Sequence, residues 1–155
     1  MRRKEKEVDD AEAVESIVSK SKVCRIAFSR DDMPYIVPMI FGYKDSVVYV
    51  HSAPEGKKIE MLKANANVCF EVDVDHELVE ADTACDFGMK YRSVIGFGKA
   101  EIIEDTADMK KALEIIMEHY SPGETYEYPS SMLERMAVIR IDLDSVSVKH
   151  SDYQG

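Results

Sequence analysis

The chain has 155 residues and a formal net charge of −10, because 20 lysines and arginines stand against 30 aspartates and glutamates. This length predicts a single domain over residues 1–155, with a flexible start at 1–8 and a tail at 150–155. Hydrophobic residues make up 45% and charged residues 32%, which is typical of a soluble globular protein. The acidity disfavours duplex nucleic acid as a partner, since phosphate binding needs clustered lysine and arginine.

The sequence also excludes several cellular settings. It has no apolar run near the roughly 20 residues that a membrane span requires. Its charged start lacks the apolar segment of a signal peptide. The three cysteines are odd in number and far apart, so no disulfide framework is predicted. We therefore expect a reduced, cytoplasmic protein without a membrane partner.

The pattern of apolar residues predicts a mainly β protein with a few helices. Helical spacing predicts helices over 9–21, 56–64 and 105–119. Alternation and β-branched residues predict six strands, over 23–29, 34–43, 47–51, 68–74, 91–104 and 136–148. The first three strands lack the crossover helices that a parallel sheet needs, which favours a small barrel. Polar segments predict a connection over 75–82 and a loop over 121–131.

Two prolines and two glycines give further information about the predicted strands. Pro34 and Pro38 cannot donate to a ladder, so one edge of the 34–43 strand must be free or bulged there. Gly96 and Gly98 lie on one face of the 91–104 strand. They leave room for a bulge or for something flat to approach the backbone.

The junction before the second helix carries an unusual charge pattern. Lys57 and Lys58 open a helix, where unpaired N–H groups already make the local potential positive. This mismatch costs roughly 0.3–1 kcal/mol per charge, and a bound phosphate would reverse its sign. The alternative is a solvated helix start in which Glu55 pairs with Lys58 and Lys57 pairs with Glu60.

Four motifs in order carry a resemblance to a known family. They are Met33–Met39 followed by Phe41 and Tyr43, then His51-Ser52-Ala53 with Gly56 and Lys58, then Asn65 with Asn67–Phe70, and then Cys85 and Phe87 with Tyr91, Ser93–Ile95 and Phe97-Gly98. With these motifs the chain resembles the flavin-binding split-barrel proteins related to pyridoxamine 5′-phosphate oxidase. Within that superfamily it is most similar to the branch of the 5-nitroimidazole-resistance proteins.

The resemblance implies a six-stranded, Greek-key split barrel that forms a homodimer with FMN at the subunit interface. It implies that the phosphate lies near Ser52, Lys57 and Lys58, and that Tyr91 and Ser93 of the partner complete the site. The isoalloxazine ring would lie against the backbone of Val37, Pro38, Met39 and Ile40. His51 matches a histidine close to the flavin, where it would donate a proton or polarise a substrate. Alternatively, His51 is a structural strand-end histidine.

Two functions remain open at this stage. The first is an FMN-dependent oxidoreductase that passes two electrons to a small nitroaromatic or quinone-like acceptor. The second is a non-catalytic module that binds flavin, deazaflavin or haem for storage, sensing or electron relay, since no Gly-rich dinucleotide fingerprint is present. Pyridoxamine 5′-phosphate oxidation itself is disfavoured, because the chain lacks the arginine-rich ending with tryptophan that the resemblance to the true oxidases would imply. No metal site is predicted, because the acids around His76 have no second ligand cluster.

Overall fold

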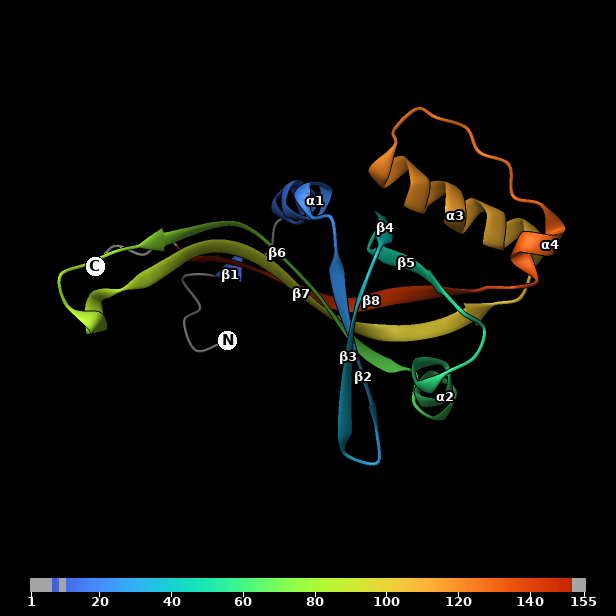
Figure 1. Cartoon of the computed structure of the whole chain (residues 1–155), viewed down its shortest axis with the longest axis horizontal. Coiled ribbons are helices and arrows are strands. Elements are labelled where there is room, and N and C mark those ends of the chain that lie inside the picture. The colour runs from blue at the N-terminus through green and yellow to red at the C-terminus, as the bar shows by residue number, and fades with distance from the viewer. Residues whose placement is uncertain (1–6, 9–10, 152–155) are drawn as a thin grey trace.

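The structure, a computed structural model, describes residues 7–8 and 11–151 and places their strands in one antiparallel sheet (Figure 1). The hydrogen-bonded order is β3-β2-β6-β7-β8-β5-β4, and β1 pairs with β8 outside this path. The strands are β1 (Glu7–Val8), β2 (Cys24–Arg30), β3 (Met33–Met39), β4 (Phe41–Lys44), β5 (Val47–Ser52), β6 (Asn67–Val79), β7 (Gly88–Ile103) and β8 (Ala137–Ser151). The helices are α1 (Ala11–Lys20), α2 (Lys57–Ala64), the 3₁₀ turn η2 (Ala84–Asp86), α3 (Thr106–Tyr120) and α4 (Ser130–Leu133).

The two edge strands of the sheet are neighbours in the sequence. β3 ends at Met39 and β4 begins at Phe41, yet these strands stand at opposite ends of the hydrogen-bonded order. Only Ile40 separates them. One residue spans at most about 3.6 Å, so the sheet has to curl until its two edges approach each other. This mainly β architecture confirms the predicted class, and the curl is consistent with a split barrel.

The predicted number of six strands is wrong. The segment predicted as a single strand over 34–43 is divided at Ile40 into β3 and β4, because the chain leaves one edge of the sheet there and joins the other. The short strand β1 precedes the first helix and pairs with residues 148–149 of β8. The rest of the predicted flexible start and the residues after Ser151 lie outside the described residues, as do positions 9 and 10 at the start of the first predicted helix.

The core occupies two regions around the curled sheet. The larger one lies between the strands, α1 and α2, and includes the fully buried rings of Phe28, Phe41 and Phe70. Phe41 and Phe70 meet edge to face, with ring centroids 5.7 Å apart. The smaller one lies under α3 and α4. All three long helices bury the apolar stripe that the sequence predicts, which includes Ile17, Leu62 and Ile116.

No helix in the described ranges combines the length and apolar character that a membrane crossing requires.

Residues 75–79 of the segment predicted as a polar connection over 75–82 are instead strand. β6 continues to Val79 past a register shift between Val74 and Glu77, and it forms with β7 an arm that projects beyond α1 (Figure 1). Ion pairs of Arg92 with Asp75 and of Lys90 with Glu77 cross this arm. Both faces of the arm meet water, so its sequence lacks the apolar alternation by which a strand is recognised.

The short helix α4 was also not predicted, because a single turn has no periodicity to detect.

The prolines and glycines of the sheet take the positions that their chemistry predicts. Pro34 and Pro38 lie on β3, which is an edge strand. A register shift between β7 and β8 falls at Phe97 and Gly98, which confirms the predicted bulge. A Cβ atom at Gly98 would lie 2.0 Å from the Asp142 carbonyl oxygen. The close approach at Gly98 is therefore made by the backbone of β8 rather than by a bound molecule.

This bulge generates a stability prediction. Gly98→Ala should lower the free energy of unfolding by about 1–3 kcal/mol, because the added methyl group overlaps rigid backbone. At Gly96 the added Cβ would meet only the flexible end of Leu143 at 3.0 Å, so Gly96→Ala serves as the matched control and should cost less. Urea unfolding of both variants measures the difference, and equal losses would contradict the proposed backbone contact.

Candidate functional site

The candidate site is centred on the junction between β5 and α2. β5 ends at Ser52, and the helix begins at Lys57 after Gly56, whose φ of 114° is a conformation that favours glycine. No side chain caps this described helix start. The Gly56 carbonyl accepts from the amides of Ile59 and Glu60, at 3.0 and 3.1 Å. An anion at this uncapped start would meet the amides of Lys57 and Lys58, which precede these two bonds.

Lys57 and Lys58 do not form the ion pairs of the solvated alternative. Within residues 11–151 no salt bridge includes either lysine, so the pairs with Glu55 and Glu60 are not made. Lys57 is exposed, and its ammonium nitrogen lies 4.5 Å from the centroid of the Tyr35 ring. Lys58 is half-buried. Both lysines thus keep a positive charge that no carboxylate neutralises.

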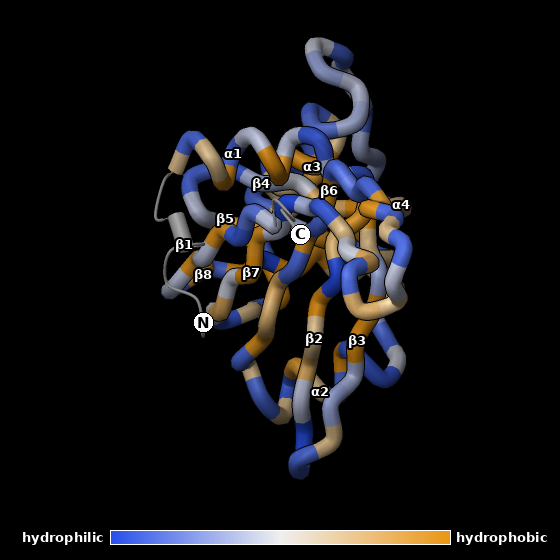
Figure 2. The backbone as a smooth tube through the Cα atoms, turned by 90° about the vertical axis from the view of Figure 1, so that its left-hand side faces the viewer, coloured by the Kyte–Doolittle hydropathy of each residue, from blue (hydrophilic) through white to orange (hydrophobic). Residues whose placement is uncertain are grey.

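The edge strand β3 lies close to this junction. α2 packs against β2, the hydrogen-bonded neighbour of β3, and the two views place the helix beside the β2–β3 hairpin (Figures 1 and 2). Main-chain groups alternate in direction along a strand, and the prolines can occupy only positions that face away from β2. Ile36 therefore directs its N–H and carbonyl to the free edge, together with the carbonyls of Pro34 and Pro38. Val37 is half-buried, Met39 is buried, and Pro38 and Ile40 are exposed.

His51 lies at the end of β5, opposite Val138 of β8. The side chain is half-buried, and this burial lowers the pKa of the imidazole below its usual value of 6.5. The ring is consequently neutral at pH 7, which favours a hydrogen-bonding role over that of a charged acid. The neighbouring Ser52 donates its hydroxyl to the carbonyl of Ala53 at 2.8 Å.

Tyr91 and Ser93 do not meet the junction within one chain. Both lie at the start of β7, in the arm that projects away from α2 (Figure 1). Ser93 is 6% exposed and stands in register between Asp73 and Lys149. The Lys149 ammonium donates to the Tyr91 hydroxyl and lies 4.8 Å from the centroid of the same ring.

The outer face of the sheet carries an apolar row that sequence reasoning missed. The row consists of Ile36, Ala27, Cys69 and Phe97, which are paired in register across β3, β2, β6 and β7. Ile36 is 59% exposed and Phe97 is 57% exposed. Tyr91 shares this face, because it lies an even number of residues from Phe97 on β7. The alternation of each strand predicts the face of each residue, but the strand order is needed to assemble the row.

A charged cluster lies beside the row on the same face. Arg25 donates to Glu71 at 3.0 Å and to Asp73 at 2.5 Å. Asp73 also pairs with His76, whereas Asp75 pairs with Arg92 and Lys20. Burial raises the pKa of Glu71. The described residues contain no group of three or more side chains placed to hold a metal ion.

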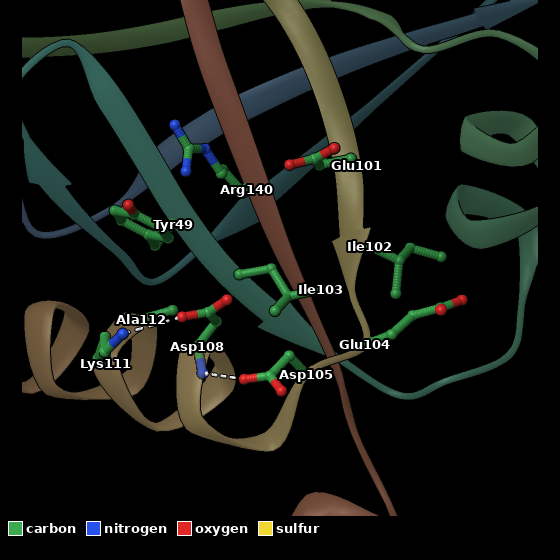
Figure 3. A pocket seen from close by; sticks show the side chains of 10 residues that line it. All are labelled: Tyr49, Glu101, Ile102, Ile103, Glu104, Asp105, Asp108, Lys111, Ala112 and Arg140. Atoms are coloured by element: carbon green, nitrogen blue, oxygen red, sulfur yellow. Dashed lines mark hydrogen bonds and ion pairs between the residues drawn. The ribbon is translucent and has the colours of Figure 1, made fainter.

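Several surface cavities lie away from the junction. One of about 460 Å³ lies between the start of α3 and the strands β5, β7 and β8 (Figure 3). The two basic residues that line this cavity form ion pairs, Lys111 with Asp108 at 3.0 Å and Arg140 with Asp142 at 2.7 Å. Four carboxylates line it, those of Glu101, Glu104, Asp105 and Asp108. Such a lining disfavours a phosphate, and none of the predicted flavin contacts lies in this cavity.

Comparison with solved structures finds similar folds over nearly the whole chain. A candidate 5-nitroimidazole antibiotic resistance protein from Bacteroides thetaiotaomicron is 35% identical, with a TM-score of 0.83 over 93% of this chain and 86% of that one. An FAD-binding protein from Mesorhizobium loti is 26% identical, with a TM-score of 0.66 over 92% and 96%. A flavocytochrome from Azotobacter vinelandii, 24% identical, shares the fold with a TM-score of 0.86 over 99% and 72%.

Sequence comparison finds a curated relative and a matching family model. A curated but uncharacterised protein from Rhizobium meliloti is 33% identical over 61 residues, which is 39% of this chain and 40% of that protein. The chain thus spans less than half of that curated relative. The family model described as pyridoxamine 5′-phosphate oxidase matches residues 10–150. The chain belongs to the pyridoxamine 5′-phosphate oxidase family.

Proposed function

We propose that this protein binds FMN and acts as an oxidoreductase that passes two electrons to a small nitroaromatic or quinone-like acceptor. The observation that carries the proposal is the start of α2, where Lys57 and Lys58 have no carboxylate partner and no side chain caps the described helix. The similarity to an FAD-binding protein supports a flavin ligand, and the similarity to a candidate nitroimidazole-resistance protein supports a nitroaromatic acceptor. In this proposal the curled sheet is a split barrel of Greek-key topology.

The residues at the junction fit a phosphate monoester. Such a group carries about −1.5 to −2 charges at neutral pH. Lys57 and Lys58 would neutralise it, and the amides of the first turn and the Ser52 hydroxyl would donate hydrogen bonds. Nothing lies within 4 Å of a Cβ atom built at Gly56, so the approach to the helix start is open.

The edge of β3 fits the polar rim of the isoalloxazine ring. Ile36 and Pro38 present main-chain groups at an edge of β3 that pairs with no other described strand, and Ile40 follows directly after it. Backbone groups on a rigid strand bind a planar heterocycle without requiring particular side chains. Val37 and Met39 would support this edge through their bonds to β2 and their packing in the core.

When bound, the flavin would supply two-electron chemistry, and the chain would supply binding and orientation. His51 is neutral near pH 7 because its burial lowers its pKa, so it would act by donating an N–H hydrogen bond. It precedes Ser52, the proposed phosphate contact, by one residue at the end of β5.

A second copy of the chain would complete the site. Tyr91 and Ser93 lie in the arm, too far along the sheet to belong to the α2 junction of the same chain (Figure 1). The apolar row ending at Ile36 and Phe97 gives the outer face a surface that association would remove from water. Packing of this face against a partner would bring that partner's arm toward the edge of β3.

The cofactor assignment is tested by titration of the purified protein with FMN and with riboflavin. The double substitution Lys57→Ala and Lys58→Ala should weaken FMN binding at least about tenfold, or about 1.4 kcal/mol, because charge-assisted contacts to the phosphate are lost. Riboflavin, which lacks the phosphate, should be affected little. The matched control is Lys63→Ala with Lys110→Ala, which makes the same change in net charge. Unchanged FMN affinity in the first variant would overturn the phosphate assignment.

The subunit arrangement is tested with Phe97→Glu. Light scattering of the unmodified protein should give twice the chain mass of 17.6 kDa. The substitution should produce monomers and weaken FMN binding, because a charge on the outer face opposes burial of the apolar row. Tyr126→Glu, in the loop after α3, is the control at another exposed aromatic residue. A monomeric unmodified protein that binds FMN tightly would contradict a two-chain site.

A non-catalytic module that binds flavin, deazaflavin or haem is the second candidate function. It is favoured by the structural similarity to a flavocytochrome. The two functions differ in turnover, so reduced nicotinamide is added anaerobically to the flavin-loaded protein. An oxidoreductase should lose its flavin absorbance quickly and regain it on addition of a nitroaromatic acceptor. His51→Ala should keep its flavin and slow this cycle, whereas absorbance that persists in the unmodified protein favours the binding module.

A further inference from the structure

Although the protein is acidic, the ammonium group of Lys57 contacts the aromatic ring of Tyr35 and no carboxylate among the described residues. Its ammonium nitrogen lies 4.5 Å from the centroid of the Tyr35 ring, within the range of about 6 Å over which a cation is attracted to an aromatic face. A carboxylate partner would cancel the charge of the lysine. An aromatic ring holds the ammonium group in place and leaves its charge available to an anion.

The position of the Tyr35 ring is fixed by the fold. Tyr35 lies in β3 opposite Phe28 of β2, and it packs half-buried against the larger core. Lysine side chains are long and flexible, so an exposed lysine at a helix start has no preferred direction of its own. The contact with Tyr35 therefore draws the Lys57 ammonium group toward β3.

β3 is also the strand whose free edge would meet the flavin ring. We propose that Tyr35 is a positioning residue, which holds Lys57 on the β3 side of the α2 N-terminus so that it receives the phosphate of a flavin lying along β3. This inference rests on the proposed function. It makes Tyr35 a determinant of the preference for a phosphorylated flavin over riboflavin, although Tyr35 itself would act only through Lys57.

The preference is measured as the ratio of the dissociation constants for riboflavin and FMN. Tyr35→Leu should weaken FMN binding about two- to fivefold, as expected for the loss of an exposed cation–π contact, and should leave riboflavin binding unchanged. Tyr35→Phe keeps the aromatic face and should keep the ratio of the unmodified protein. Tyr126→Leu, at an exposed tyrosine outside the site, is the matched control.

A double-mutant cycle with Lys57→Ala separates positioning from packing. If Tyr35 acts through Lys57, adding Tyr35→Leu to Lys57→Ala should produce no further loss of FMN affinity. Equal losses for FMN and riboflavin, or additive losses in the double variant, would overturn the positioning role while leaving flavin binding intact. An unmodified protein that binds neither flavin would overturn the proposed function itself. Should Tyr35→Leu not fold, Tyr35→Met takes its place, because its flexible side chain removes the aromatic face and adapts to the surrounding core.

Discussion

The passage of the chain from β3 to β4 through a single residue is the constraint on which the rest of the structure depends. Ile40 joins strands at the two ends of the hydrogen-bonded order, so the sheet curls and its edges approach each other. β5 pairs with β4 at one end, whereas α2 packs on β2 near the other. The junction between β5 and α2 thereby comes to the edge of β3. The candidate site exists because the two edges of the sheet approach each other.

The lysines at the start of α2 differ in their partners from the paired cations of the described surface. Several cations elsewhere pair with acids, as Arg25 does with Glu71, Arg92 with Asp75 and Arg140 with Asp142. Such exposed pairs contribute little stability, but they neutralise the charges that they involve. Lys57 instead lies on an aromatic ring at a helix start. A protein with a net charge of −10 thus keeps a small positive region where an anion would be held by charge and by backbone donors together.

The sequence predicted those elements whose signals are local. The helices over α1, α2 and α3 follow from apolar spacing, and the side chain of Asp105 caps α3 by accepting from the Asp108 amide at 3.0 Å. The edge position of β3 follows from its prolines. The extension of β6 through Val79 and the division of one predicted strand at Ile40 were missed, because each depends on which strands lie alongside.

For the candidate site, the sequence by itself determined the chemistry at the β5–α2 junction. Two lysines in the first turn of a helix oppose the positive potential there, and this mismatch can be recognised from the sequence without any tertiary contact. Only the tertiary structure decided that Tyr35, rather than Glu60, is the partner of Lys57, and that Arg25 is paired on the outer face. The apolar row of Ile36 and Phe97 likewise required the strand order. Partners in a curled antiparallel sheet lie far apart in sequence, so their identity depends on strand pairing and register, which no local pattern records.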